Sequence, residues 1–541
     1  MSNNLVLSRR QLIKLGLLAA VAPRSLLSAR APWTFAVFSD THYGVAGTYE
    51  KNEMLLREIA ALNPDFAFDV GDLTERAWPE EFDQATRAFA AVPYKVHVAP
   101  GNHDVRWAPG GPLMFNQRIG PTRQLIKHRD AAFLLLDSTV PLSHFGHIGG
   151  PQERWIAEQL RTIDPATPLF VFFHHPMGRA SGIDDDFRLA RALAPYNTKV
   201  IFTAHGHSDL LWEWNGITAT MNKGLYQGSY QFVTMDPDAG VIRIQRRTTE
   251  KPALTPLTEI PLGPVRRSVT PPAAPAPESP PTGALRKAWE QPLGGGVMSE
   301  LILHDDTLFV SGMDGALYAF AARDGRLRWQ AKTDGYLHSS PTVFGKSVIV
   351  GSADGHVYAF ARADGKPQWR VATRGPVYGS AALANGIAAI PSGDGVVYGI
   401  DARNGSIRWR YTLEPGPSAF AQSPVVTDGQ RFYVGAWDQN VYALDTKTGK
   451  EVWRYRASER GFYYSAAIAR PALHRSRLFI PSNDNTLHCI DTQNGAAVWK
   501  QQAPADKFGY SSPVHADGRI YIGSLGDKGQ VHCLDAANGQ F

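Results

Sequence analysis

Two hydrophobic patterns divide this chain. In the first half, short unbroken apolar runs, such as Thr34–Ser39, Phe66–Val70 and Leu169–Phe173, alternate with stretches whose apolar residues recur at helical spacing. Apolar runs of this length are too short for helices and are typical of buried strands. Strands that alternate with helices predict a layered α/β domain whose functional site lies beyond the strand ends.

The same patterns predict the other elements of this domain. In the first expected helix, Met54, Leu55, Ile59 and Leu62 share one face, which we expect to be buried. Helices are predicted at residues 51–62, 81–91 and 151–160, further strands at 96–98, 132–137 and 199–204, and a closing hairpin at 230–235 and 241–245.

The second half repeats one pattern of short strands. Successive tryptophans are 40 to 46 residues apart, and each repeat places a glycine four residues before its tryptophan. This period is typical of the four-stranded blades of a β-propeller. We expect six blades, with seven as the alternative, and expect the strand carrying Trp289 to complete the last unit, which stops at Phe541. The pairs are Gly325 and Trp329, Gly365 and Trp369, Gly405 and Trp409, Gly449 and Trp453, and Gly495 and Trp499.

A proline-rich segment separates the two halves. Between residues 264 and 283 the chain contains seven prolines among mostly small or polar residues. Such a composition buries no core and forms an extended spacer. Because 541 residues are too many for one ordinary core, we predict a first domain at residues 32–263, a linker at 264–284 and a repeat domain at 285–541.

The first 31 residues resemble an export signal. Ser8–Lys14 is similar to a twin-arginine motif, an apolar stretch follows at Leu15–Ala22, and Ala29-Arg30-Ala31 offers a cleavage site. The apolar stretch is too short to span a bilayer stably. We therefore expect residues 1–31 to be a twin-arginine signal peptide, with a frayed amphipathic helix as the alternative. The mature chain is then periplasmic or secreted and has no transmembrane segment.

Charge and cysteine content add little to this picture. The formal charge is +5, but residues 1–31 contain five basic and no acidic residues, so the rest of the chain is neutral. This balance gives no indication of a nucleic-acid partner. Cys489 and Cys533 occupy equivalent positions in two repeats, and we expect them to be small buried residues, with a disulfide as the alternative.

Side chains that can bind metals follow the predicted strands of the first domain. Alternate residues on an extended segment point the same way, so Asp40 and His42 can share one metal ion. Carboxylate, amide and imidazole groups without thiolate suit Mn, Fe, Zn or Co. The side chains at the strand ends are Asp40, His42, Asp72, Asn102, His103, Asp104, His174, His175, His205 and His207.

This ordered set, between about Trp33 and Thr249, resembles that of the calcineurin-like metallophosphoesterases. The resemblance implies a four-layer α/β/β/α sandwich with two divalent metal ions (Mn, Fe or Zn) and a metal-bridging hydroxide that attacks phosphorus. His103 would act on the leaving-group oxygen as an acid or as a charge stabiliser, oriented by Asp104. By the same resemblance, Asp40, His42, Asp72 and His207 would hold one ion, and Asp72, Asn102, His174 and His205 the other.

Other polar residues receive weaker assignments. His175 is expected to lie beside the ligands without binding metal, and Arg106 is a candidate to contact phosphate. His97, His144 and His147 lie outside the motifs and are expected to be structural. The histidine at position 42 resembles the branch of cyclic-nucleotide and glycerol phosphodiesterases, although phosphomonoesterases share it. The resemblance therefore implies a small phosphodiester substrate, with a phosphomonoester as the alternative.

The repeats resemble those of quinoproteins, in which the tryptophan docks between adjacent blades and the glycine forms the hairpin turn. Quinone-dependent dehydrogenases carry adjacent cysteines at the cofactor, and this sequence has none, so bound PQQ is not expected. Repeats are scaffolds, and we expect a binding platform for a protein, glycan or envelope ligand. The sequence thus predicts an exported metallophosphoesterase with a C-terminal propeller. The alternative is a propeller-based envelope binding protein whose phosphoesterase domain is accessory.

Overall fold

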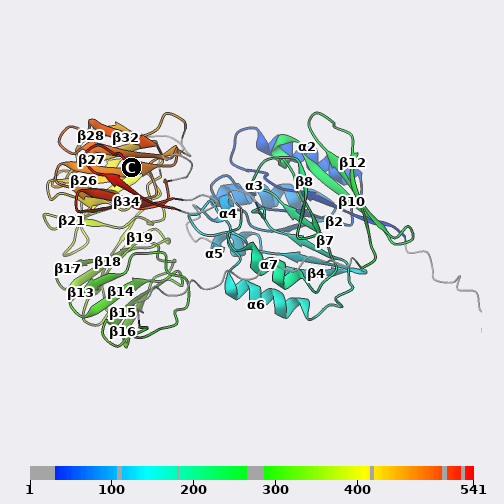
Figure 1. Cartoon of the computed structure of the whole chain (residues 1–541), viewed down its shortest axis with the longest axis horizontal. Coiled ribbons are helices and arrows are strands. Elements are labelled where there is room, and N and C mark those ends of the chain that lie inside the picture. The colour runs from blue at the N-terminus through cyan, green and yellow to red at the C-terminus, as the bar shows by residue number, and fades with distance from the viewer. Residues whose placement is uncertain are drawn as a thin grey trace, which may run out of the picture.

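The computed structural model describes residues 31–106, 112–178, 182–264, 286–414, 420–461, 464–502, 508–524 and 530–541. The expected signal peptide, apart from Ala31, and the expected linker, apart from Pro264, lie outside these residues. Figure 1 shows an N-terminal α/β body beside a C-terminal body built of strands. Every helix in the described part of the chain is too short or too polar to span a lipid bilayer.

Two six-stranded sheets form the centre of the N-terminal domain, in the orders β12-β11-β10-β1-β2-β3 and β4-β5-β6-β7-β9-β8. Strands β1 to β3 run parallel, as do β5, β6, β7 and β9, so several strands of each sheet end at one edge. The strands are β1 (Trp33–Phe38), β2 (Phe66–Asp69), β3 (Lys95–Val98), β4 (Gln124–His128), β5 (Ala131–Leu135), β6 (Leu169–Phe172), β7 (Thr198–Thr203), β8 (Leu210–Trp214), β9 (Ile217–Met221), β10 (Tyr230–Asp236), β11 (Val241–Arg247) and β12 (Thr255–Pro261).

Aromatic side chains fill the space between these two sheets. Phe68 of the first sheet stacks on Phe172 of the second, with ring centroids 4.0 Å apart. Helices α2 (Thr48–Ala61) and α3 (Pro79–Ala90) pack on the outer face of the first sheet, and α6 (Gly149–Leu160) and α7 (Asp186–Leu193) on that of the second. Strands covered on both faces are apolar throughout, which is why unbroken apolar runs predicted this mixed α/β domain. The remaining short helices are α4 (Asn102–Val105), α5 (Pro112–Arg118) and η1 (Leu225–Gln227).

The predicted buried face of α2 is partly wrong. Met54 is 53% exposed, whereas Asn52 is fully buried beside Leu55 and Ile59. The apolar spacing could not reveal this, because Asn52 is buried through a hydrogen bond that its side-chain N–H donates to the Thr41 carbonyl, at 2.7 Å. Helix α7 and strands β4, β8, β9 and β12 were also missed by the sequence analysis. The closing hairpin, β10 with β11, is confirmed.

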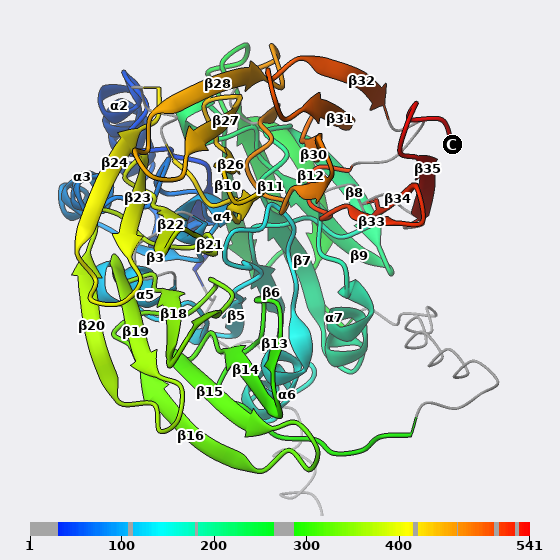
Figure 2. The same cartoon turned by 90° about the vertical axis from the view of Figure 1, so that its left-hand side faces the viewer.

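The C-terminal domain contains five four-stranded antiparallel sheets and, among the described residues, one three-stranded sheet. Figure 2 shows them following one another around a centre, consistent with a propeller. The strands are β13 (Ile302–His304), β14 (Thr307–Ser311), β15 (Ala316–Ala321), β16 (Leu327–Lys332), β17 (Thr342–Phe344), β18 (Ser347–Gly351), β19 (His356–Ala361), β20 (Pro367–Ala372), β21 (Ala382–Ala384), β22 (Ile387–Pro391), β23 (Val396–Asp401), β24 (Ile407–Thr412), β25 (Val426–Thr427), β26 (Arg431–Gly435), β27 (Asn440–Asp445), β28 (Glu451–Arg456), β29 (Ala472–His474), β30 (Arg477–Ser482), β31 (Thr486–Asp491), β32 (Ala497–Gln502), β33 (Val514–Ala516), β34 (Arg519–Gly523) and β35 (Val531–Asp535).

Each repeat tryptophan packs against the turn glycine of the next sheet, not of its own. A Cβ on Gly449 would lie 2.4 Å from the ring of Trp409, and Trp409 Nε1 donates to the carbonyl of Thr446 at 3.3 Å. Gly449 has a φ of 67°, in the left-handed region. The glycine is therefore needed twice, for the turn conformation and for the close approach of the ring.

The last sheet is not closed as predicted. Trp289 does dock on the first sheet, donating to the Ala322 carbonyl at 2.9 Å. However, residues 286–301 form no strand, and β35 pairs only with β34 among the described residues. Instead, Gly294 and Gly295 of this segment lie tightly against Asp314, in the turn between β14 and β15. The alternative of a disulfide is also wrong, because Cys489 and Cys533 are both free thiols.

The loop at residues 136–148, between β5 and α6, belongs to the N-terminal domain and packs against the C-terminal domain. Leu142 is buried in a cluster with Tyr336, Ala353 and Tyr378 of the C-terminal domain. Pro141, Leu142 and Ser143 together line a cavity of about 290 Å³ in the C-terminal domain. The other lining residues of this cavity lie mostly just before the first strand of each C-terminal sheet. Beside it, Arg106 of the N-terminal domain lies 4.9 Å over the ring of Trp437.

We expect Gly449→Ala to destabilise the propeller more than Gly386→Ala does. Both glycines have left-handed φ values, 67° and 75°, but a Cβ on Gly386 meets only the mobile end of Arg403, at 3.4 Å. The shared backbone strain costs about 1 kcal/mol, and overlap with the Trp409 ring adds roughly 1–3 kcal/mol. Denaturant unfolding followed by tryptophan fluorescence measures the difference. Equal effects of the two substitutions would contradict the tryptophan–glycine packing.

Candidate metal centre

The predicted ligands meet at the carboxyl ends of the parallel strands. Their loops are held together by backbone hydrogen bonds, such as those from Asp40 N to Gly71 O (2.8 Å) and from His42 N to Asp72 O (3.1 Å). Left-handed backbone is rare outside glycine and persists only where the surroundings enforce it. Residues with φ values between 43° and 72° include Asp40, His42, Asp72, His205 and His207.

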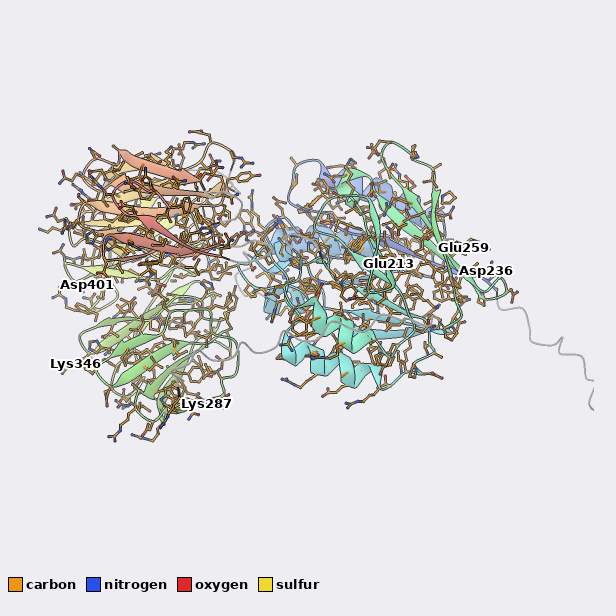
Figure 3. All side chains as sticks on the ribbon, viewed as in Figure 1. Glu213, Asp236, Glu259, Lys287, Lys346 and Asp401 are labelled. Carbon is orange, nitrogen blue, oxygen red and sulfur yellow. The ribbon has the colours of Figure 1, made fainter. Side chains whose placement is uncertain are left out.

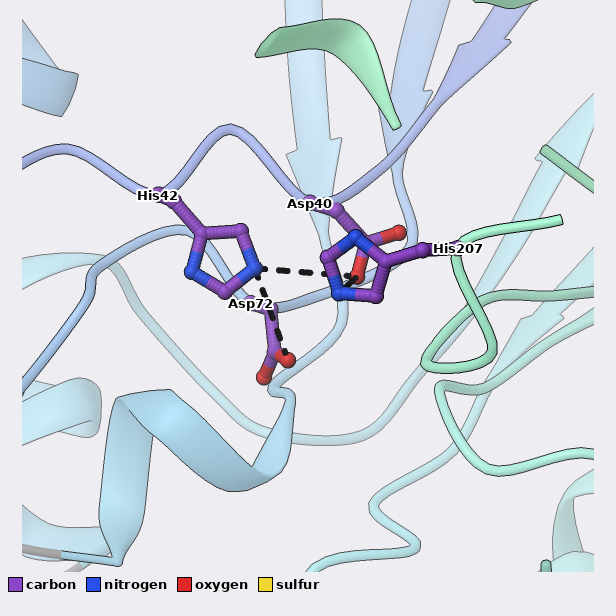
Figure 4. Close-up of side chains that lie close together, drawn as sticks. All are labelled: Asp40, His42, Asp72 and His207. Atoms are coloured by element: carbon purple, nitrogen blue, oxygen red, sulfur yellow. Dashed lines mark ion pairs between the residues drawn. The ribbon is translucent and has the colours of Figure 1, made fainter. Parts of the chain in front are cut away.

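Four of these side chains form a first cluster, drawn in Figure 4. His42 Nε2 lies 4.0 Å from Asp40 Oδ1 and 4.0 Å from Asp72 Oδ2, and His207 Nε2 lies 3.5 Å from Asp40 Oδ1. Asp40 Oδ1 and His42 Nε2 are buried and have no hydrogen-bond partner among the described residues. Since buried polar atoms are nearly always paired, these lone pairs facing one point fit a bound cation.

A second cluster shares Asp72 with the first. His174 Nε2 lies 3.1 Å from Asp72 Oδ2, and His205 joins them so that one ligand atom of each lies within 4.8 Å of the others. Asn102 Oδ1 lies 2.8 Å from His205 Nδ1. Two clusters of oxygen and imidazole ligands that share a carboxylate fit a pair of transition-metal ions.

The charges at this centre attract one another strongly. Burial opposes the charged form of Asp72, but His174 and other imidazoles lower the pKa of its carboxyl well below the usual value. Burial likewise opposes protonation of His174, but the charge of Asp72 raises the pKa of this histidine to about 9. The carboxylate that stabilises a proton on His174 can stabilise a metal cation in the same way.

Three of the four candidate ligand histidines are oriented through the other ring nitrogen. His42 Nδ1 lies 2.8 Å from Glu75 Oε2, His174 Nδ1 lies 2.9 Å from the Val70 carbonyl, and His207 Nδ1 lies 3.2 Å from the hydroxyl of Tyr226. Such contacts turn the remaining nitrogen toward the metal and are typical of metal sites. The sequence analysis missed Glu75 and Tyr226. The position of Glu75, three residues after Asp72, was the feature of the sequence that could have indicated its place beside the ligands.

His103 lines the cavity above the two clusters. Its Nδ1 lies 2.7 Å from the carbonyl oxygen of Glu75. A carbonyl only accepts hydrogen bonds, so Nδ1 carries a proton and Nε2 is the nitrogen that gains or loses one. Burial lowers the pKa of this imidazole.

Asp104 does not orient His103 as predicted. Its carboxylate accepts hydrogen bonds from the backbone N–H groups of Gly101 (2.9 Å), Leu73 (3.2 Å) and Thr74 (2.8 Å). The side chain therefore ties the loop after β3 to the loop after β2. The prediction failed because adjacency in sequence suggested a side-chain contact, whereas the short α4 turns Asp104 toward the backbone of these loops.

The other candidates lie in different surroundings. His175 is buried beside the clusters, with Nδ1 2.8 Å from Ser138 Oγ and its ring centroid 4.8 Å from that of His205. His144, expected to be structural, lines the cavity and lies 4.4 Å from His205 by ring centroids. Arg106 also lines the cavity, as its predicted contact with phosphate requires. His97 packs on Phe68, and His147 pairs with Asp184, both away from the cavity lining.

The cavity itself has a volume of about 720 Å³. Its floor includes His42, Asp72, His205 and His207, and its opposite side is formed by the C-terminal domain. This volume is larger than a single phosphate group needs and lies in the range of sites that hold small organic ligands.

We expect Gly101→Ala to reduce metal binding. A Cβ on Gly101 would lie 2.1 Å from Asp72 N and 2.2 Å from Asp72 Oδ1, so the shared carboxylate must move. Elemental analysis of the purified, manganese-loaded protein should fall from about two ions per chain to below one. Gly263→Ala, in open space, is the matched control and should leave the metal content unchanged. Full metal content in the Gly101→Ala protein would contradict this geometry.

Comparison with known proteins identifies both halves of the chain. Residues 34–209 match the calcineurin-like phosphoesterase family, and residues 279–419, 356–468 and 438–541 match the family of the outer membrane protein assembly factor BamB. A cAMP/cGMP dual specificity phosphodiesterase of Mycobacterium tuberculosis is 25% identical over 200 residues, which cover 33% of this chain and 63% of that protein. A 3′,5′-cyclic adenosine monophosphate phosphodiesterase of Haemophilus influenzae is 28% identical over 201 residues, covering 35% of this chain and 72% of that protein.

Among solved structures, BamB from Moraxella catarrhalis matches with a TM-score of 0.39 at 18% identity, covering 45% of this chain and 70% of that one. This chain spans less than two thirds, 63%, of the length of the mycobacterial relative. The matched family is that of calcineurin-like phosphoesterases, and both of these relatives are named as cyclic-nucleotide phosphodiesterases. The N-terminal domain of this chain is therefore a calcineurin-like metallophosphoesterase domain, and its C-terminal domain consists of BamB-like repeats.

Proposed function

We propose that this protein hydrolyses phosphodiesters with two divalent metal ions, and phosphomonoesters less well. The observation that carries the proposal is the pair of side-chain clusters that share Asp72 at the floor of a cavity lined by His103. The relatives named as cyclic-nucleotide phosphodiesterases support the same reaction class.

The proposed ligands follow the two clusters. Asp40, His42, Asp72 and His207 hold one ion, and Asp72, Asn102, His174 and His205 hold the other. Mn, Fe or Zn suits these donors. When bound, the two ions supply activated water and neutralise the charge of the phosphoryl group.

His103 is the proposed general acid. The carbonyl of Glu75 keeps the proton of the ring on Nδ1, so that Nε2 can carry the proton that passes to the leaving oxygen. His175 and His144 stay beside the ligands, where they pack against His205 and limit the motion of its ring.

The C-terminal sheets are proposed to form a six-unit propeller that completes the substrate pocket. A cavity shared by the metal centre and the propeller favours an enzyme over a binding protein with an accessory phosphoesterase domain. Export through the twin-arginine signal, with a periplasmic or secreted location, is part of the proposal, because that route carries folded proteins and would let the metal ions be inserted first.

We expect Asp72→Asn to abolish metal-dependent hydrolysis, because it removes the charge that both clusters share. His103→Gln should lower kcat by about a hundredfold to ten thousandfold, the usual contribution of a general acid, while metal content is retained. The assay compares bis(p-nitrophenyl) phosphate with p-nitrophenyl phosphate, with added Mn²⁺ and with chelator.

His147→Gln is the matched control, since His147 lies outside the cavity lining, and it should keep wild-type turnover. Turnover that survives Asp72→Asn, or that a chelator leaves unchanged, would show that this centre does not catalyse the reaction.

A further inference from the structure

The propeller forms the wall of the cavity that faces the metal centre. Its contribution consists of one cationic and four neutral polar side chains, with no carboxylate among the described lining residues of this domain. These residues are Arg460, Tyr464, Asn483, Asn485 and Tyr510.

Arg460 is the cation of this wall. It is exposed, and its guanidinium lies 4.2 Å over the ring of Tyr464. Among the described residues it has no ion pair, and the adjacent Glu459 pairs with Arg456 at 3.0 Å. Stacking on a ring uses the face of a guanidinium and leaves the N–H donors at its edge available. An arginine that is stacked in this way and has no ion pair can therefore bind an anion through two parallel N–H···O hydrogen bonds.

Asn485 adds an uncharged group to the same wall. Its backbone is left-handed, with a φ of 71°, and its Oδ1 atom is buried without a hydrogen-bond partner among the described residues. Buried amide oxygens normally have a donor, and a hydroxyl or amine group of a ligand in this cavity would supply one.

The wall is held in place relative to the metal centre by direct contacts. Tyr510 packs on Phe145 with ring centroids 5.4 Å apart, and the neighbouring His144 packs on the candidate ligand His205. Arg106 lies over Trp437 close by. A ligand that spans the cavity thus meets both domains in a fixed geometry, and a remote charge can contribute to substrate selection.

We propose that Arg460 binds a second anionic group of the substrate, so that the preferred substrate is a phosphodiester that carries a further phosphate or carboxylate away from the bond that is cleaved. This inference rests on the proposed phosphodiesterase function, and it makes the propeller a substrate-selecting part of the site.

The test compares two chromogenic diesters that differ by one phosphate. They are thymidine 5′-(p-nitrophenyl phosphate) and the same compound with a 3′-phosphate. The full-length, manganese-loaded protein should show a kcat/KM about tenfold higher for the compound with the second phosphate, as expected for a charge-assisted contact that is partly exposed. Arg460→Ala should remove this preference by slowing only that compound, and Arg460→Lys should keep part of it.

Arg403→Ala is the matched control. Arg403 pairs with Asp401 at 3.4 Å, and Figure 3 shows Asp401 on the side of the propeller that faces away from the N-terminal domain. This variant should keep the wild-type ratio. A ratio of about one in the wild-type protein, or an equal loss for both compounds in Arg460→Ala, would overturn the inference.

Binding separates this inference from the proposed function. Calorimetry of the same proteins with thymidine 3′,5′-bisphosphate and thymidine 5′-phosphate needs no turnover. The bisphosphate should bind more tightly than the monophosphate, and Arg460→Ala should abolish this difference. That result supports the anion site even if neither diester is hydrolysed. A lack of hydrolysis would refute only the phosphodiesterase proposal. Equal affinity for both nucleotides would refute the anion site even in an active enzyme.

Discussion

The centre of this protein depends on one shared buried carboxylate, that of Asp72. It faces His42 on one side and His174 on the other, and its own backbone is left-handed. The space around it is so tight that no side chain fits at Gly101, and a Cβ on Gly71 would lie 2.6 Å from Gly101 N. Strain of this kind costs about 1–3 kcal/mol at each position, and the hydrogen bonds of Asp104 to the loops after β2 and β3 offset it. The carboxylate next to His103 in sequence thus acts on the shape of the loops and not on the imidazole.

The loop between β5 and α6 makes the metal centre and the propeller interdependent. One part of it places His144 against His205, and another places Leu142 in the centre of the propeller. Phe145, which follows His144, contacts both the His144 ring and Tyr510. A displacement of the propeller would therefore be transmitted to a candidate metal ligand through three consecutive packed rings, those of Tyr510, Phe145 and His144.

The sequence was informative where a chemical requirement is local. Candidate ligands at strand ends, such as Asp40 and His42, and turn glycines four residues before a tryptophan are visible as spacing. In the structure Asp40 and His42 lie close together, and each tryptophan packs on the turn glycine of the next sheet. What the sequence could not show depends on contacts between distant segments. Glu75 orients His42 because two loops meet, and His144 reaches the cavity only through the course of a long loop. The helix α2 shows the same limit, since Asn52 is buried by a hydrogen bond that no hydrophobic pattern records.

The contacts between the domains also bear on how the site should be understood. Leu142 is buried in the propeller, and burying a leucine side chain stabilises by about 1.5–3 kcal/mol. Arg106, which is 1% exposed, stacks on Trp437, a contact worth about 2 kcal/mol when it is desolvated. Without the propeller, the phosphoesterase domain would expose Leu142 and Phe145 and lose one wall of its cavity. The candidate metal centre would then lack the polar groups that the propeller adds to the cavity lining. In the proposed function, substrate selection is therefore a property of both domains together, because the polar groups opposite the candidate ligands belong to the propeller.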